Sequence, residues 1–166
     1  RHSLQEIDSI IERCAEIDKY EQGYIPLVME KFPLADLVCI IKASQPNERI
    51  YTILRGTDEN LVLRSDLYYI KSILNNLLTN ALKYSVVESL VELKVEYKTS
   101  SFNSELLFSV SNEVADDAKL DSIRVFDRYY RSESAKQHSG AGLGLWLAQS
   151  MAHTLGSHIK LTTERQ

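Results

Sequence analysis

The sequence has few of the residues that build disulfide scaffolds and zinc sites. Only two cysteines, Cys14 and Cys39, occur among its 166 residues, with no CxxC pair and no cluster of the four histidines. This composition excludes a disulfide framework and a zinc site with the usual ligand spacing, and it is typical of a protein in a reducing cytosol. Both cysteines are predicted to be small buried hydrophobic residues.

Long apolar runs and basic patches are also absent. No stretch approaches the roughly 20 apolar residues that cross a bilayer, so the sequence predicts a soluble protein. The 19 basic and 23 acidic residues give a net charge of −4, and a negative field without a basic patch argues against a nucleic-acid partner. Because the chain starts with Arg1 and not with Met, we expect it to be part of a longer protein.

Hydrophobic residues make up 44% of the chain, which is enough for one domain with a real core. Their spacing predicts both helices and strands. Helices are expected over residues 3–22, 33–44, 66–85 and from about 142 to 155, and strands over 24–32, 49–56, 60–64, 90–99, 105–112 and 157–163, with 49–56 and 60–64 forming a hairpin. The predicted fold class is α+β, a two-layer sandwich in which three helices cover one face of a mixed sheet.

The helix predicted over 66–85 carries polar residues at positions that share one face. Asn76, Asn80, Lys83 and Tyr84 are separated by offsets of four, seven and eight residues from the first of them, which places them on the same side. Such a face is most often simply solvated. However, two carboxamide oxygens suit Mg²⁺, a lysine one turn later can meet a phosphate, and a tyrosine offers a flat ring. The combination indicates a magnesium nucleotide.

Half of the six glycines lie in one short stretch, "SGAGLGLW", directly before the last predicted helix. The first amides of a helix are unpaired and carry partial positive charge, and glycines let an anion approach them closely. The stretch therefore suits a polyphosphate. Glycines also serve turns and helix caps, so this pattern alone leaves both interpretations open. It is neither a P-loop nor a dinucleotide-binding fingerprint.

Three stretches, in this order, resemble motifs of the GHKL superfamily, and specifically of sensor histidine kinases. "NNLLTNALKYS" resembles their N box, "VFDRYYRSES" their F box and "GAGLGL" their second glycine box. The resemblance runs from about Glu21 to the end of the chain. It implies a catalytic domain with an α/β sandwich fold that binds ATP and Mg²⁺ between the N-box helix and a mobile lid. Such a domain transfers the γ-phosphate to a histidine on a dimerisation hairpin.

The resemblance also implies roles for individual residues. Asn80 would coordinate Mg²⁺ with Asn76 nearby, Lys83 would reach a phosphate, and Tyr84 would flank the adenine. Arg131, or as the alternative Arg128, would stabilise phosphate charge, and the segment from about 132 to 139 would form the lid. The glycine box would contribute Gly140, Gly142, Leu143, Gly144 and Leu145, and the residues expected to act in catalysis are Asn76, Arg131 and Arg128.

Two positions depart from the pattern of related ATPases. The stretch "NEVADD" stands where the family has its first glycine box, and Asn112 occupies the position of the aspartate that accepts a hydrogen bond from adenine. An uncharged acceptor forms a weaker bond, so we expect weakened or altered nucleotide affinity. The alternative is a degenerate nucleotide-sensing or scaffolding module without kinase activity. Hydrolysing relatives carry a glutamate where this chain has Asn76, so we expect slow attack by water and disfavour an ATP hydrolase.

No histidine lies in a stretch that resembles the phosphoacceptor box of the family. We therefore expect the acceptor histidine upstream of residue 1, and we interpret residues 1–22 as the tail of the hairpin's second helix or a linker helix. Residues 23–166 would then form the ATP-binding catalytic domain. The expected partners are ATP, the protein's own dimerisation domain and a response regulator. The fragment is expected to be a monomer, and the intact protein a homodimeric bacterial inner-membrane sensor with this domain in the cytoplasm.

Overall fold

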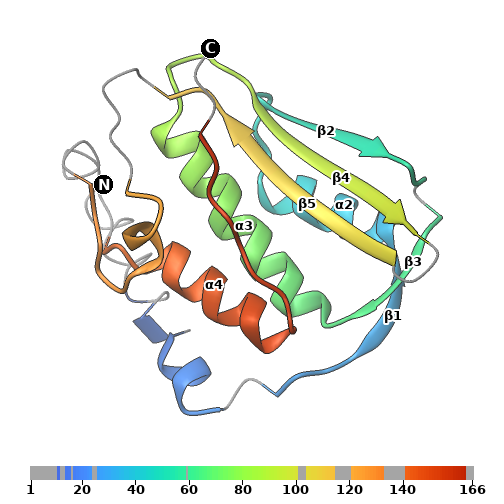
Figure 1. The fold of residues 1–166 in the computed structure, drawn as a ribbon, viewed down its shortest axis with the longest axis horizontal. Helices are drawn as coiled ribbons and strands as arrows, with labels where there is room; N and C mark the ends of the chain where they lie inside the picture. The colour runs from blue at the N-terminus through green and yellow to red at the C-terminus, as the bar shows by residue number, and fades with distance from the viewer. Residues whose placement is uncertain are drawn as a thin grey trace. The chain divides into compact units, whose positions relative to one another are not determined.

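The computed structural model describes residues 11, 14, 15, 17–23, 26–58, 60–100, 104–114, 121–132 and 141–163. The chain divides into two compact units, whose helices and strands are drawn in Figure 1. One comprises Met29–Ala118, and the other comprises Arg1–Val28 and Lys119–Gln166. No helix within the described ranges is both long enough and apolar enough to cross a membrane.

The described residues of the Met29–Ala118 unit form two helices and two sheets. In chain order its elements are β1 (Glu30–Pro33), α2 (Leu34–Ser44), β2 (Ile50–Arg55), β3 (Val62–Ser65), α3 (Leu67–Tyr84), β4 (Val91–Thr99) and β5 (Ser104–Asn112). Strands β1 and β3 pair antiparallel as a small sheet. In the larger sheet β4 is central, parallel to β2 and antiparallel to β5, so this sheet is mixed, as predicted.

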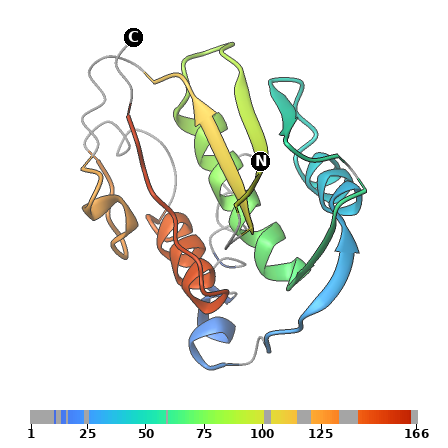
Figure 2. The same cartoon turned by 45° about the vertical axis from the view of Figure 1, so that its right-hand side comes forward.

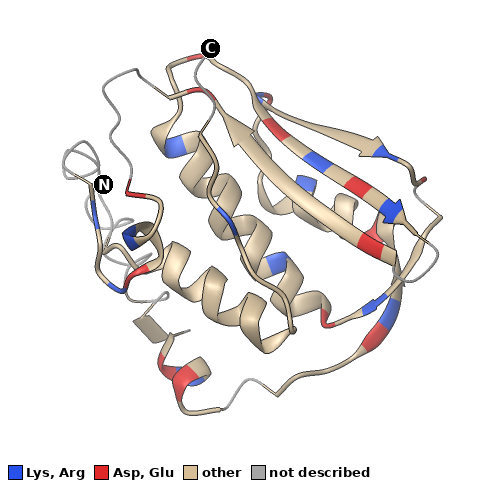
Figure 3. Cartoon of the chain, in the orientation of Figure 1, with Lys and Arg blue, Asp and Glu red and all other residues tan. Residues whose placement is uncertain are grey.

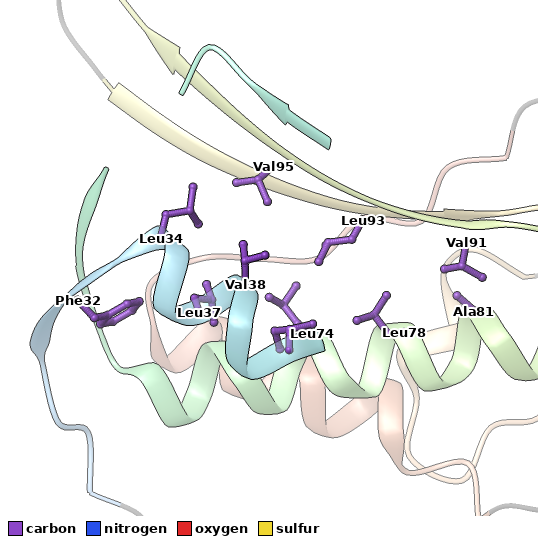
Figure 4. Close-up of a cluster of buried hydrophobic side chains, with 11 residues drawn as sticks. Phe32, Leu34, Leu37, Val38, Leu74, Leu78, Ala81, Val91, Leu93 and Val95 are labelled. Atoms are coloured by element: carbon purple, nitrogen blue, oxygen red, sulfur yellow. The ribbon is translucent and has the colours of Figure 1, made fainter. Parts of the chain in front are cut away.

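The core of this unit lies between β4 and the helices α2 and α3 (Figure 4). Side chains alternate along a strand, and Val91, Leu93 and Val95 of β4 point toward the helices, where they are 2% exposed or less. The intervening residues of β4 are the charged ones on its other face (Figure 3). Opposite β4, Leu74 and Leu78 of α3 complete the buried layer. The α+β layering is thus confirmed for α2 and α3, whereas the helix predicted from about 142 to 155 belongs to the other unit.

Helix α3 begins where a side chain can satisfy its first amides. The carboxylate of the N-cap residue Asp66 accepts a 2.9 Å bond from the Tyr69 N–H, which is the usual role of aspartate at this position. The helix then continues without glycine or proline to Tyr84, as the predicted range 66–85 requires.

The second unit contains a helical segment at 17–21, a 3₁₀ turn η1 (Arg124–Phe126) and helix α4 (Gly144–Thr154) (Figure 2). Helix α4 ends in a Schellman motif. Gly156, with φ at +73°, donates to the His153 carbonyl, and the Ser157 N–H donates to the Ala152 carbonyl, so a glycine supplies the left-handed residue that this motif needs. The predicted end of the helix near Leu155 is confirmed.

The predicted hairpin between 49–56 and 60–64 is wrong. Strand β3 pairs with β1, and β2 runs parallel to β4. The backbone of Gly56 approaches the chain of β4 so closely that a Cβ there would lie 2.5 Å from the Tyr97 carbonyl oxygen. The turn residues between the two strands are a local signal, whereas the strands that pair with β2 and β3 are distant in sequence. The local pattern therefore predicted the wrong pairing.

Two predicted strands differ from the structure. The strand expected over 24–32 begins at Glu30, where pairing with β3 begins. Residues 157–163 form no strand, because the backbone of Ile159 is bonded instead to the Gln149 side chain, whose Oε1 accepts from the Ile159 N–H at 2.7 Å. The prediction that Cys14 and Cys39 are buried is also wrong, since both are exposed.

Candidate functional site

The polar face of α3 contains a buried oxygen without a hydrogen-bond partner. Asn76 is 7% exposed, and its Nδ2 donates to the Ser72 carbonyl oxygen at 2.9 Å. Its Oδ1 has no partner among the described residues. Because an unsatisfied buried carbonyl group is unfavourable, this oxygen suggests a ligand. Asn80, one turn later, is half-buried, so two carboxamides, groups that magnesium can accept as ligands, share this face.

Lys83 and Tyr84 are the last two residues of the same helix. The Lys83 Nζ lies 5.1 Å from the centre of the Tyr84 ring, and both side chains are half-buried. A cation this close to an aromatic face is held by the ring's negative face. The structure thus brings together the four residues predicted on α3, with an ammonium group placed one turn beyond the carboxamides.

Arg49 organises the loop that follows α3, and the sequence analysis did not identify it. Its Nε donates to the Ser89 carbonyl at 2.8 Å, and its Nη2 donates to the Val86 carbonyl at 3.1 Å and to the Ser85 hydroxyl. The planar guanidinium therefore fixes three points of one loop. Its partners lie 36 to 40 residues away in sequence, so no local pattern indicated this role.

Asn112, the predicted base-contacting residue, lies at the end of β5 in the same unit. The loop after α3 meets this end of the strand, because the Val86 N–H donates to the Glu113 carbonyl at 3.0 Å. The Asn112 Nδ2 also points to this carbonyl, at 3.3 Å. Residues 115–120, which include the last three residues of "NEVADD", lie outside the described part of the chain. The structure therefore connects Asn112 to the end of α3 and leaves its base-contacting role a prediction.

Gly142 belongs to the other unit, and its lack of a side chain has a specific cause. Its φ is +70°, and a Cβ there would lie 2.7 Å from the Tyr130 carbonyl oxygen and 2.9 Å from the carbonyl carbon of Tyr129. The Tyr129 N–H donates to the Gly142 carbonyl at 3.0 Å. The backbone of residues 129–130 by itself therefore forbids a side chain at Gly142, and the predicted approach of a phosphate to this glycine stays a prediction.

The start of α4 has no side-chain cap. Leu143 is the N-cap residue, and a leucine side chain cannot accept a hydrogen bond. The helix begins at Gly144, two residues later than predicted, and continues with Leu145; no residue of α4 is Asp, Glu, Lys or Arg (Figure 3). Such a start favours an anion. Gly140 and the predicted lid residues 133–139 lie outside the described residues.

The F-box arginines differ in their surroundings. Arg128 Nη1 lies 2.8 Å from the Glu21 carboxylate, and its guanidinium carbon lies 5.0 Å from the ring of Trp146 and 5.1 Å from that of Tyr129. Arg131 is half-buried at the point where the described segment ends, and its Cγ lies 3.1 Å from the Cβ position of Gly142. Both candidate arginines therefore lie in the unit that contains the start of α4.

The comparisons with known proteins decide the family. Residues 65–166, more than half of the chain, match the family of histidine kinase-, DNA gyrase B- and HSP90-like ATPases. The chain belongs to this family. The matched range begins just before α3 and includes α4, so it contains both the carboxamide face and the glycine stretch. The predicted membership in the GHKL superfamily is thereby confirmed.

Solved structures of histidine kinases share the fold of this family member. The chain is 18% identical to the Acinetobacter baumannii histidine kinase AdeS, with a TM-score of 0.63 over 92% of this chain and 69% of that one. It is 18% identical to the mycobacterial sensor histidine kinase MprB, with a TM-score of 0.53 over 78% and 81%. Full-length ShkA in complex with AMPPNP is 19% identical, with a TM-score of 0.65 over 94% of this chain and 32% of that protein. No curated protein sequence matches.

Replacing Asn76 by leucine should separate stability from binding. Leucine removes the unpaired Oδ1, whose burial is unfavourable, and we expect the free energy of unfolding to rise by about 1 kcal/mol. Nucleotide binding in the presence of Mg²⁺ should weaken in the same variant. Denaturant unfolding and calorimetry measure the two quantities. A less stable variant would show that the oxygen is satisfied in the unliganded protein.

Proposed function

We propose that this chain is the ATP-binding catalytic domain of a sensor histidine kinase, which transfers the γ-phosphate of ATP to a histidine of the same protein outside this chain. The single observation that carries the proposal is the buried, unpartnered Oδ1 of Asn76 on a helix within the matched ATPase range. A nucleotide-bound Mg²⁺ could use this oxygen as a ligand. We further propose residues 1–22 as the linker or hairpin tail and 23–166 as the catalytic domain.

The donor set fits a magnesium nucleotide. Asn80 and Asn76 would hold the metal through neutral oxygens, as hard cations accept. When bound, Mg²⁺ neutralises phosphate charge and orients the triphosphate. Lys83 would bind a phosphate, Tyr84 would flank the base, and Asn112 would accept from its amino group. The unpaired amides at Gly144 and Leu145 favour the phosphate chain.

The residues of the chain act by positioning and by charge, as phosphoryl transfer requires. Arg131 or Arg128 would stabilise the charge that develops on the transferred group. Asn76 has no group that titrates in the physiological range and therefore cannot serve as a general base for water. Transfer to a histidine remains open because the imidazole supplies its own nucleophilic nitrogen, and we expect hydrolysis to be slow by comparison.

The intact protein would be a homodimer that passes its phosphate to a response regulator, with this domain in the cytoplasm beneath an inner-membrane sensor. The chain spans about a third of full-length ShkA, which leaves room for such additional parts in proteins of this fold. A second candidate is a nucleotide-sensing or scaffolding module without kinase activity. It is favoured by Asn112, which stands in place of a charged acceptor.

Phosphate transfer distinguishes the two candidates. The chain is titrated with ATP and Mg²⁺ by calorimetry and then incubated with γ-labelled ATP and the histidine-bearing hairpin of the same protein. A kinase domain should bind ATP and place an acid-labile, base-stable phosphate on the hairpin, with much slower release of free phosphate. Binding without a label would favour nucleotide sensing. If calorimetry detects no heat of binding and the hairpin takes up no label, only the scaffolding function is left.

A further inference from the structure

Residues 17–21 are bonded to α4 and to the segment that precedes it, within one unit. The Glu21 carboxylate accepts a 2.8 Å hydrogen bond from Arg128 Nη1, across 107 residues of sequence. The Tyr20 hydroxyl donates to the Ser150 carbonyl of α4 at 2.9 Å. Two neighbouring side chains of the segment thus contact two separate points of the glycine-box helix and the F box.

Arg128 lies beside the start of α4. Its guanidinium carbon is 5.0 Å from the ring of Trp146, and Trp146 is the third residue of this helix. The helix itself carries no Asp, Glu, Lys or Arg, and its N-cap residue Leu143 has no acceptor. Arg128 therefore adds a full positive charge to the partial charge of the first amides. Glu21 neutralises that charge.

We infer that the Glu21 carboxylate and the phosphates of a nucleotide compete for Arg128, so that docking of residues 17–21 and nucleotide binding oppose each other. The inference rests on the proposed function, because it takes the start of α4 as the place of the phosphates. In the docked state Arg128 is paired with Glu21. In the nucleotide-bound state the guanidinium turns to the polyanion, and the segment 17–21 loses its ion pair while the hydrogen bonds of Tyr20 to Ser150 and Thr154 remain.

Linkage makes the effect reciprocal. If nucleotide weakens the docking of 17–21, then a force that undocks this segment raises nucleotide affinity by the same factor. The segment lies in the part of the chain that we propose as the linker to the phosphoacceptor hairpin. A movement of that linker would therefore reach the nucleotide site through one ion pair, without a change in the fold of either unit.

The test uses the Glu21→Gln variant and a matched control. Asp18→Asn makes the same change in charge within the same segment, but the Asp18 carboxylate accepts from Gln22 Nε2 at 2.6 Å. Binding of ADP and ATP with Mg²⁺ is followed by the emission of Trp146, which is the only tryptophan. We expect E21Q to bind about three- to fivefold more tightly at low salt and D18N to bind like the wild type. Glu21 and Arg128 are 42% and 38% exposed, so the difference should shrink at high salt.

A double-mutant cycle excludes a general effect on charge or packing. Arg128→Gln should bind nucleotide more weakly than the wild type, and adding E21Q to R128Q should change nothing further. Tyr20→Phe removes the hydrogen bonds to Ser150 and Thr154 without altering charge, and it should also raise nucleotide affinity, by a smaller factor. Unchanged binding by E21Q, an equal gain in D18N, or a gain that persists in R128Q would each overturn the inference alone. Absence of binding by the wild type would overturn the proposed function together with it.

Discussion

Substituting Asn80 by alanine is expected to abolish Mg²⁺-dependent nucleotide binding, with an affinity loss on the order of 100-fold. Asn80 lies one turn beyond the unpartnered Asn76 oxygen on the half-buried face of α3. Without its carboxamide only one protein oxygen of this face remains for the metal, and a hard cation then keeps water in its place. Calorimetry with ATP, with and without Mg²⁺, measures the loss.

The chain offers a matched control for this experiment. Asn75 stands on the same helix, but its Oδ1 accepts a 2.9 Å bond from the Ser44 hydroxyl of α2, so its side chain is already used within the fold. The Asn75→Ala variant should bind nucleotide as the wild type does. Unaltered affinity in Asn80→Ala, or an equal loss in both variants, would show that α3 does not present a metal site.

Replacing Gly142 by alanine should destabilise the unit that contains α4 by about 3 kcal/mol or more. The left-handed backbone at φ +70° disfavours any side chain, and the new Cβ would lie 2.7 Å from the Tyr130 carbonyl oxygen. The two atoms closest to this Cβ, the Tyr130 carbonyl oxygen and the Tyr129 carbonyl carbon, belong to the backbone. The clash can therefore be relieved only if the chain moves at residues 129–130. We expect a lower melting temperature and, since Gly144 follows closely, weaker nucleotide binding.

The Gly156→Ala variant distinguishes the effect of the left-handed backbone from the effect of the close contact at Gly142. The φ of Gly156 is +73°, but nothing lies within 4 Å of its Cβ position. Alanine at Gly156 should therefore cost only the backbone term, about 1–2 kcal/mol, and leave nucleotide binding intact. Equal losses of stability at Gly142 and Gly156 would mean that the close approach of the F-box backbone contributes nothing.

Local signals in the sequence predicted the elements whose stability is local. Helix α3 has an apolar stripe, an aspartate cap and no internal glycine or proline, and its predicted range agrees with the structure. Strands β4 and β5 alternate clearly and form a hairpin, as their short connection suggests. The pairing of β2 with β4 and of β1 with β3 depends on contacts between distant segments, and therefore the turn residues of the stretch "GTDEN" misled the prediction.

In the candidate site, too, the sequence predicted what depends on local spacing and not what depends on contacts between distant segments. Spacing along one helix was sufficient to group Asn76 with Asn80 and Lys83, because a helix fixes which residues share a face. It could not indicate that Arg128 pairs with Glu21, or that Arg49 clamps the loop after α3, since these partners are brought together only by the folded chain. The sequence also could not indicate that the backbone of residues 129–130 lies against Gly142.

The most direct test of the proposed metal site replaces Mg²⁺ by Mn²⁺, which takes similar oxygen ligands, and records the side-chain amide resonances by NMR. With nucleotide present and Mn²⁺ at a small fraction of the protein concentration, the paramagnetic ion should broaden the Nδ2 signals of Asn76 and Asn80 first, and that of Asn75, whose side chain is bonded to Ser44, only at higher ratios. Without nucleotide the broadening should be weak. Strong broadening elsewhere in the chain, with Asn76 and Asn80 unaffected, would contradict the account.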